Sequence, residues 1–196
     1  MTARRHQPLD HLALAAVRET PGLDAGVTLR ALPYQASIIL RGEGGDAAFL
    51  AAFRAGLGFD LPVTPNHVSS HGEFTALWLG PSEWLILGDT GPAGLAKALA
   101  GQHHAIINNG DGQQVIAISG PRARDVLGKH CPLDLDGPEF APGRCARSIL
   151  ARCGILLHPQ PDVAFHIYVA RSFADYTWRL LADAGLEYGV AIAGGD

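Results

Sequence analysis

The pattern of apolar and polar positions in the first half of the chain predicts one complete α+β lobe. A short apolar run over residues 36–41 is typical of a buried strand. After a break of glycines, Asp46 has the position of a helix N-cap, and apolar residues follow at helical spacing up to Gly56. The predicted elements that follow are strands at 74–79 and 84–87 joined by a four-residue loop, a helix over 92–101 and a strand at 105–108.

The second half of the chain repeats this order of elements. Strands are predicted at 115–119, within 145–157, at 163–169 and within 186–192, and one helix starts at residues 120–121. Ser172 is predicted to cap the last helix, with Asp175 in the capping-box position. The predicted buried stripe of this helix consists of Phe173, Thr177, Leu180, Leu181 and Ala184.

The order strand, helix, strand, strand, helix, strand is that of the ferredoxin-like unit. We therefore predict an α+β chain of two interlocked ferredoxin-like lobes. The expected ranges are an irregular N-terminal segment at 1–35, a first lobe at 36–110 and a second lobe at 111–196. Trp78 and Trp84 flank the predicted hairpin loop of the first lobe, and we expect both to be at least half buried.

Composition excludes two classes of protein. Apolar residues make up 47% of the 196 residues and charged residues 17%, which is enough to build a core and is not typical of disorder. The net charge of −4 argues against a nucleic-acid or acidic-membrane partner, since either would need clustered Lys and Arg. The short basic run at residues 4–6 is expected to be a solvated tail.

The sequence predicts a cytoplasmic protein with reduced thiols. The N-terminus lacks the long apolar run of a secretory signal, and no stretch approaches the length that crosses a bilayer. Cys131, Cys145 and Cys153 are odd in number and form no CxxC pair. We therefore expect buried, reduced thiols, and neither a disulfide framework nor a zinc knuckle.

Residues 42–47, GEGGDA, resemble a dinucleotide-binding loop between a strand and a helix. Glu43 and Asp46 would place carboxylates where the pyrophosphate charge must lie. In addition, Pro62 and Pro65 break the segment where a parallel strand should follow. A turn followed by an N-cap explains the same residues, and we favour it over a nucleotide site.

Other candidate chemistry also has a simpler interpretation. His67 and His71 have a spacing that could bind a metal on a helix, but their neighbours predict a loop, and the adjacent His103 and His104 would point to opposite faces of a strand. Surface histidines are the favoured interpretation. No G-x-S-x-G motif occurs, and Ser119 is expected to cap a turn. Asp134 and Asp136 lie in a loop rich in Pro and Gly, so no paired catalytic carboxylates are predicted.

Three stretches together resemble a known family. They are LWLGPSEWLIL at 77–87, ISGPRARDVL at 118–127 with CPLDL at 131–135, and FAPGRC at 140–145 with YVARSFA at 168–174. In order and spacing, this set is similar to the gamma subunits of heterotetrameric sarcosine oxidases, from about residue 61 to 181. A Gly-Pro turn alone is common, whereas the ordered set is specific.

The resemblance implies a role within a larger flavoenzyme. Such a complex oxidises sarcosine to glycine, passes the methyl carbon to tetrahydrofolate and gives its electrons to oxygen. The resemblance places FAD, FMN, NAD and tetrahydrofolate in the larger alpha and beta subunits and zinc in the small delta subunit. It implies no cofactor, catalytic residue or metal in this chain, and a fold similar to the aminomethyltransferases, or T-proteins, of glycine cleavage.

The resemblance also suggests two residues of a folate-type pocket, Asn108 and Arg171. Residues 108–111 fall where the family has an Asp-Val-Ser-His stretch and where folate-using relatives have an acid. Because Asn108 cannot exchange a proton at physiological pH, catalysis by this chain is disfavoured. Arg171 lies between a strand and a helix, and it is expected either in a surface ion pair or as the anchor of an acidic group, internal or on a partner.

Two alternatives of other classes remain open. The first is a free-standing, folate-binding aminomethyltransferase-like protein, which should have a carboxylate at the Asn108 position and a longer chain. The second is a scaffold subunit of another complex. Neighbouring genes for a dinucleotide-binding subunit and a flavin subunit would favour the oxidase.

Overall fold

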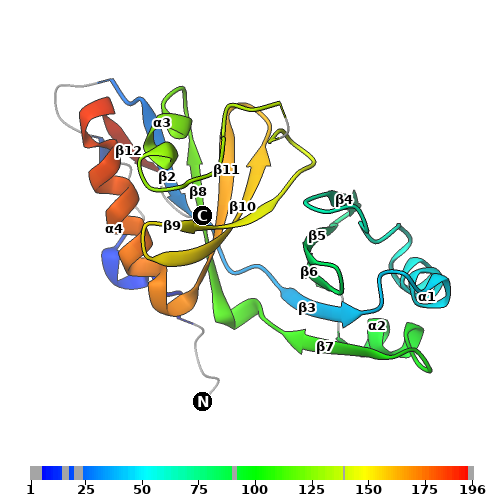
Figure 1. The fold of residues 1–196 in the computed structure, drawn as a ribbon. Coiled ribbons are helices and arrows are strands. Elements are labelled where there is room, and N and C mark those ends of the chain that lie inside the picture. The colour runs from blue at the N-terminus through cyan, green and yellow to red at the C-terminus, as the bar shows by residue number, and fades with distance from the viewer. Residues whose placement is uncertain (1–5, 15–17, 20–23, 90–91, 139, 194–196) are drawn as a thin grey trace, which may run out of the picture. The chain divides into compact units, whose positions relative to one another are not determined.

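The computed structural model describes residues 6–14, 18–19, 24–89, 92–138 and 140–193. The chain has a mixed α+β fold with two sheets, as predicted (Figure 1). Its contacts divide it into two compact units. The larger unit comprises Met1–Tyr34, Gly112–Pro142 and Arg147–Asp196, and the smaller unit comprises Gln35–Asp111 and Gly143–Ala146.

The smaller unit has the ferredoxin-like order of elements with one additional strand. Its five-stranded sheet has the order β4-β5-β6-β3-β7, and all neighbouring strands are antiparallel. Without β4, this is the second-third-first-fourth order of a ferredoxin-like sheet. The elements are β3 Ser37–Gly42, α1 Ala47–Leu57, β4 Val68–His71, β5 Phe74–Gly80, β6 Glu83–Leu87, α2 Pro92–Ala98 and β7 His104–Asn108.

Helices α1 and α2 contact each other and enclose the core of the smaller unit (Figure 1). Phe49 and Phe53 of α1 are buried against Trp84 and Ile86 of β6 in one apolar cluster. Burial of each such side chain stabilises the fold by about 1.5–3 kcal/mol. Gly42, the last residue of β3, lies next to this cluster. A larger residue would not fit there, because a Cβ at position 42 would lie 2.2 Å from Cζ of Phe49.

The larger unit holds a seven-stranded sheet in the order β1-β12-β2-β8-β11-β10-β9. Helix α4 contacts α3 and also β2, β8 and β11, so these helices cover the apolar side of the sheet (Figure 1). Short 3-10 helices η1 Asp10–Leu12, η2 Gly110–Gly112, η3 Arg171–Phe173 and η4 Leu186–Tyr188 connect the elements of the chain. The other elements are β1 Arg18–Glu19, β2 Val27–Ala31, β8 Gln113–Ser119, α3 Ala123–Gly128, β9 Ala146–Leu150, β10 Cys153–Gln160, β11 Ala164–Ala170, α4 Ala174–Gly185 and β12 Val190–Ala193.

Strand β2 is inserted into the ferredoxin-like order of the larger unit. It lies between β8 and β12, pairs antiparallel with β8 and runs parallel to β12. Leu29 is opposite Ile118 on one side and Ile192 on the other. The prediction of an irregular N-terminal segment was therefore wrong for this stretch. A five-residue strand has a weak local pattern, and its partners lie far away in the sequence.

The contact units also differ from contiguous halves of the sequence. The larger unit takes in the N-terminal segment, and the smaller unit takes in Gly143–Ala146 beside its main part. An isolated β-bridge between His67 and Arg144 joins Gly143–Ala146 to the main part of the smaller unit. Side-chain and backbone contacts of Cys145 with Trp78 and Asn66 add to it.

Three local predictions were also wrong. The turn between β5 and β6 has two residues, 81–82, because β5 continues to Gly80 past an irregularity after Trp78. Ser172 does not cap α4, since η3 precedes this helix and its N-cap residue Phe173 makes no side-chain cap. Phe173 is 44% exposed, and the buried face of α4 instead includes Trp178.

Candidate functional site

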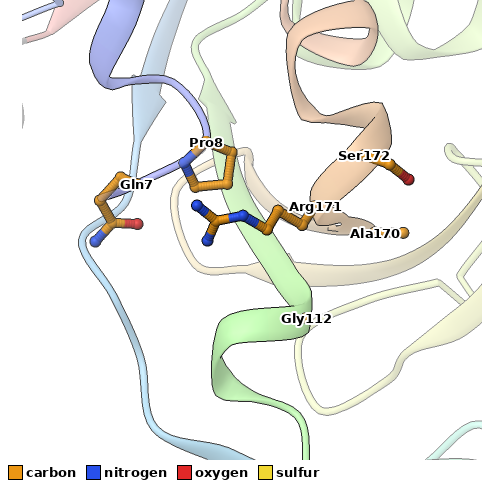
Figure 2. A pocket seen from close by; sticks show the side chains of 6 residues that line it. All are labelled: Gln7, Pro8, Gly112, Ala170, Arg171 and Ser172. Carbon is orange, nitrogen blue, oxygen red and sulfur yellow. The ribbon is translucent and has the colours of Figure 1, made fainter. Parts of the chain in front are cut away.

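A shallow hollow of about 580 Å³ lies in the larger unit, and Figure 2 shows the guanidinium of Arg171 reaching across it toward Pro8 and Gln7. The hollow combines polar and apolar side chains. Its lining consists of Gln7, Pro8, Gly112, Ala170, Arg171 and Ser172.

The sheet positions the hollow. Gln113 at the start of β8 is opposite Ala170 at the end of β11, so Gly112 and Arg171 leave the sheet side by side. The third wall comes from the N-terminal segment, where the backbone N–H of Gln7 donates to Oδ2 of Asp10 at 2.8 Å. Nη2 of Arg171 donates to the backbone carbonyl of His6 at 2.7 Å, and this bond fixes the direction of the side chain.

Among the described residues, Arg171 uses only part of its hydrogen-bonding capacity. A guanidinium has five N–H donors, and the carbonyl of His6 accepts from one nitrogen only. Within the described residues, Arg171 forms no ion pair with a carboxylate. The predicted surface ion pair is therefore not formed inside the described part of the chain, whereas a group able to bind an acid is present at the hollow.

The nearest acidic side chain on α4 is already paired. Oδ2 of Asp175 accepts from Nε of Arg179 at 2.8 Å, and its Oδ1 lies 2.8 Å from Nε2 of His11. These hydrogen bonds, that of Arg179 first, hold the pKa of Asp175 below its usual range, and the same pair raises the pKa of Arg179. Asp175 therefore serves as a link between η1 and α4, and not as the capping-box residue that the sequence predicted.

Asn108, the other suggested pocket residue, lies in the smaller unit. It ends β7, its side chain is exposed, and its Oδ1 accepts from the backbone N–H of Gly110 at 3.2 Å. It does not line the hollow at Arg171. Residues 108–111 thus form a local turn before β8, and their part in folate binding stays a prediction.

The glycine-rich loop at 42–47 is a turn with an N-cap, as predicted. Oδ1 of Asp46 accepts from the backbone N–H of Ala48 at 2.8 Å, at the N-terminus of α1. The carboxylate therefore takes the position that a phosphate would need. The strand that follows α1, β4, lies at the far edge of an antiparallel sheet and not beside β3.

The histidines at 67 and 71 are not on a helix. His71 belongs to β4, which contradicts the predicted loop, and its ring stacks on Phe59 at 6.4 Å between centroids. Nδ1 of His67 lies 3.0 Å from the carbonyl of Pro65, and Nη1 of Arg144 lies 2.9 Å from each of the two ring nitrogens. His103 is exposed and His104 begins β7.

The remaining candidates have structural roles. Oδ1 of Asp134 accepts from the backbone N–H groups of Asp136 and Gly137, which closes a turn. Cys131, Cys145 and Cys153 are free and buried, as predicted, and burial raises the pKa of the Cys145 thiol to about 12. No group of three His, Cys, Asp or Glu side chains suited to a metal occurs among the described residues.

Sequence reasoning missed a pair of histidines in the larger sheet. His158 of β10 is opposite His166 of β11, and their rings meet edge to face at 6.3 Å. Burial, with a smaller effect of His166, lowers the pKa of His158 to about 4, and burial lowers the pKa of His166. Nδ1 of His158 is buried and has no hydrogen-bond partner among the described residues. Both rings are therefore neutral at physiological pH.

Three lining residues of the hollow, Gln7, Pro8 and Gly112, were also missed. None belongs to a motif, and the N-terminal segment was expected to be irregular, so no sequence signal pointed to them. Arg171 itself was recognisable from its place between a strand and a helix.

In the described part of the chain, no helix has the length and apolar character needed to span a membrane.

Comparisons with known proteins place the chain in a family. Residues 41–187 match the family described as "Sarcosine oxidase, gamma subunit family". The gamma subunit of sarcosine oxidase from Arthrobacter sp is 34% identical over 193 residues, which cover 95% of this chain and 93% of that protein.

Solved structures give the same result. A chain of the heterotetrameric sarcosine oxidase from Corynebacterium sp. U-96 in complex with pyrrole 2-carboxylate has a TM-score of 0.83 and 30% identity, and the match covers 94% of this chain and 96% of that one. The glycine cleavage aminomethyltransferase T from Bartonella henselae has a TM-score of 0.62 at 16% identity, over 95% of this chain and 51% of that one, which shows a shared fold alone. The chain belongs to the sarcosine oxidase gamma subunit family.

Proposed function

We propose that this chain is the non-catalytic gamma subunit of a heterotetrameric sarcosine oxidase. The complex would oxidatively demethylate sarcosine to glycine, with tetrahydrofolate as acceptor of the methyl carbon. The observation that carries the proposal is the similarity to gamma subunits at 34% identity over nearly the whole of both chains. The near-complete overlap with one chain of a heterotetrameric oxidase supports it.

We further propose that larger alpha and beta subunits and a small delta subunit are the partners. FAD, FMN, NAD, tetrahydrofolate and zinc would be bound by those partners and not by this chain. Two features support this division. Asp46 caps the helix after the only glycine-rich loop that resembles a dinucleotide site, and Asn108 stands where folate-using relatives have an acid. Reduced, buried thiols fit a cytoplasmic complex.

The test is co-expression with the larger subunits encoded beside this chain, followed by size-exclusion chromatography and an oxidase assay. We expect the chain to co-elute with a yellow flavoprotein, and the purified chain alone to be colourless and without sarcosine oxidation. Separate elution, together with full oxidase activity in the absence of this chain, would contradict the subunit role. Flavin absorbance or turnover from the isolated chain would contradict the non-catalytic role.

A second function, binding of folate by the chain itself, is favoured by the fold shared with aminomethyltransferase T and by the hollow at Arg171. Tetrahydrofolate titrated into the isolated chain would then quench the fluorescence of its tryptophans. Equal titrations of the wild type and of Arg171→Gln would exclude the hollow as the folate site.

A further inference from the structure

Strand β7 forms one edge of the smaller sheet, and β3 is its neighbour in that sheet (Figure 1). Directly after the strand, the backbone N–H of Asn109 donates to the carbonyl of Ser37 at 2.9 Å. Because every second residue of an antiparallel pair exchanges hydrogen bonds with its partner, this bond fixes the pattern along the whole pair. Ala105 and Ile107 therefore direct their backbone groups toward β3.

The other three residues of β7 direct their backbone groups away from the sheet. These residues are His104, Ile106 and Asn108. Among the described residues, no strand lies on that side of β7, and their N–H and C=O groups form no bond there to another backbone group. The outer side of β7 is therefore an open strand edge.

The other three edges of the two sheets are protected. In the smaller sheet, Val68 of β4 donates its backbone N–H to the carbonyl of Gly143 at 3.0 Å, so another segment of the chain covers part of that edge. In the larger sheet, β1 has only two residues, and β9 carries the exposed Arg147. Short strands, charged side chains and covering segments all keep an edge from pairing with other chains.

Strand β7 lacks these forms of protection. It has five residues, without Lys, Arg, Asp, Glu or Pro, and its register with β3 contains no bulge. Ile107 is 47% exposed and shares a face of the strand with the exposed Ala105, since side chains two positions apart point the same way. Ile106, on the opposite face, packs against the apolar cluster of the smaller unit. The strand is thus anchored on one face and open along its edge.

We propose that the open edge of β7 binds an extended segment of a larger partner subunit, which adds to the smaller sheet as a sixth strand. The backbone of this segment exchanges hydrogen bonds with His104, Ile106 and Asn108, and one of its apolar side chains packs on Ile107. In this mode of recognition, backbone pairing supplies affinity and side-chain contacts supply specificity. The inference rests on the proposed function, because it takes the segment from a subunit of the same complex.

The geometry of the edge specifies a strand as the occupant. Backbone donors and acceptors at every second residue match those of another extended chain, whereas a helix has already used its own backbone groups. Five residues at about 3.4 Å each make an edge of roughly 17 Å, which is the length of an ordinary strand. A heterotetramer of four different subunits contains one copy of this chain, so the proposed complex offers no second copy to fill the edge.

The experiment measures binding of the full chain to the immobilised complex of its co-expressed larger subunits. His104→Pro and Ile106→Pro each remove one outward N–H and leave the bonds to β3 in place, and Ile107→Lys puts a charge beside the incoming strand. The matched controls are Ser70→Pro, which removes an outward N–H from the other edge strand β4, and Val63→Lys, which changes a loop side chain that is 50% exposed. The urea midpoint of each variant verifies that it is folded.

We expect each β7 variant to weaken binding by about tenfold or more, because a hydrogen bond is lost and its partner stays buried or a charge is buried. Both controls should stay within about threefold of the wild type. If Ile106→Pro is unfolded, His104→Pro and Ile107→Lys decide the result, since both leave the Ile106 side chain in the core.

Hydrogen exchange gives a second readout that reports on the backbone itself. In the free chain, the amides of Ala105 and Ile107 should exchange slowly and those of His104, Ile106 and Asn108 fast, because only the first two are bonded to β3. In the complex, a peptide covering residues 102–110 should gain protection of about three amides. A contact made by side chains alone would not protect them.

The outcomes separate this inference from the proposed function. If the wild type binds and the β7 variants bind equally well, the strand addition is wrong while the subunit role stands. Weaker binding of the variants without added protection of the amides would also contradict strand addition. If the wild type binds no partner, both proposals fail. A dimer of this chain that is lost in Ile107→Lys and persists in the complex would overturn the inference, because the edge would then hold a second copy.

Discussion

Trp84 joins the sheet of the smaller unit to the loop after α1. Its side chain is fully buried, and its indole N–H donates to the backbone carbonyl of Pro62 at 2.7 Å. Its partner across the strands, Trp78, is partly buried. The prediction that both tryptophans are at least half buried is confirmed.

We predict that Trp84→Ala lowers the free energy of unfolding by about 3–5 kcal/mol, because it leaves a large cavity among Phe49, Ile86 and their neighbours. Trp84→Phe should cost less, since it keeps a ring and loses mainly the bond to Pro62. Urea unfolding measures both values. A loss below about 1 kcal/mol for Trp84→Ala would contradict the buried position of the ring.

The histidine pair predicts a pH dependence of stability. Because the folded-state pKa of His158 is about 4, the unfolded chain takes up a proton first as the pH falls below about 6.5. The stability from this group is therefore complete above pH 6.5 and is lost progressively toward pH 4. At pH 5 the loss is on the order of 1–2 kcal/mol.

The comparison of the wild type with His158→Gln isolates this effect. Urea unfolding at pH 7 and pH 5 should show a smaller decrease for the variant than for the wild type. Tyr168 stacks on His158, and His166 lies opposite it, so the other titrating groups near the ring remain present in both proteins. Equal decreases would contradict a buried, neutral His158.

Single residues between β11 and α4 were only partly predictable. Arg171 was recognisable, because a charged residue between a strand and a helix lies at the surface. Phe173 was assigned to the buried stripe, whereas the buried face includes Trp178 instead. Phe173 lies in η3 as the N-cap of α4, so the helical spacing that groups the buried Thr177, Leu181 and Ala184 does not extend to it.

The start of helix α1 can be predicted from the sequence. Asp46 accepts the N–H of Ala48, and the helix ends at Leu57 before Gly58, which has a positive φ of 80°. Such a residue allows the left-handed end of a helix without strain. The start was predicted from this local signal, whereas the predicted stop at Gly56 lies inside the helix, two residues before Gly58.

We predict that Asp46→Ala destabilises the protein by about 0.5–2 kcal/mol, because the N–H of Ala48 loses its acceptor. Asp46→Asn keeps an acceptor at the same place and should cost much less. Thermal unfolding followed by circular dichroism measures both. If the alanine and asparagine variants lose equal stability, the cap is not the cause.

Strand β4 shows why other elements escaped prediction. Its residues Val68–His71 include no apolar alternation, because the strand lies at the edge of the sheet beside β5. Edge strands are often short and polar, which protects them from unwanted pairing. Such a strand forms because β5 provides hydrogen-bond partners. Its own residues carry no pattern from which it could be predicted.

At the scale of the whole molecule, the element order was predictable and the division of the chain was not. Two ferredoxin-like orders follow from local periodicity. The insertion of β2 between β8 and β12, and the association of Gly143–Ala146 with the smaller unit, depend on pairing between distant residues. Single-sequence patterns carry no information on such pairing.

We therefore predict that the C-terminal part of the chain, expressed alone, does not fold. A fragment of residues 111–196 lacks β2, so β8 and β12 each lose a neighbour in the middle of the sheet. We expect no cooperative urea transition from this fragment, whereas the full chain unfolds cooperatively. The control is a fragment in which residues 24–34 are joined to 111–196 by a flexible linker. Cooperative unfolding of the fragment without β2 would contradict this view of the sheet.

The position of β2 has a consequence for synthesis of the chain. Val27 leaves the ribosome first, its partner β8 follows, and Val190 opposite Val27 on β12 is made long after both. At ordinary translation rates this interval is on the order of ten seconds or more, during which one edge of β2 is uncovered. Only a chain translated through Ala193 seals that edge. A chain that stops before β12 thus keeps an open strand edge, and such an edge can pair with other chains.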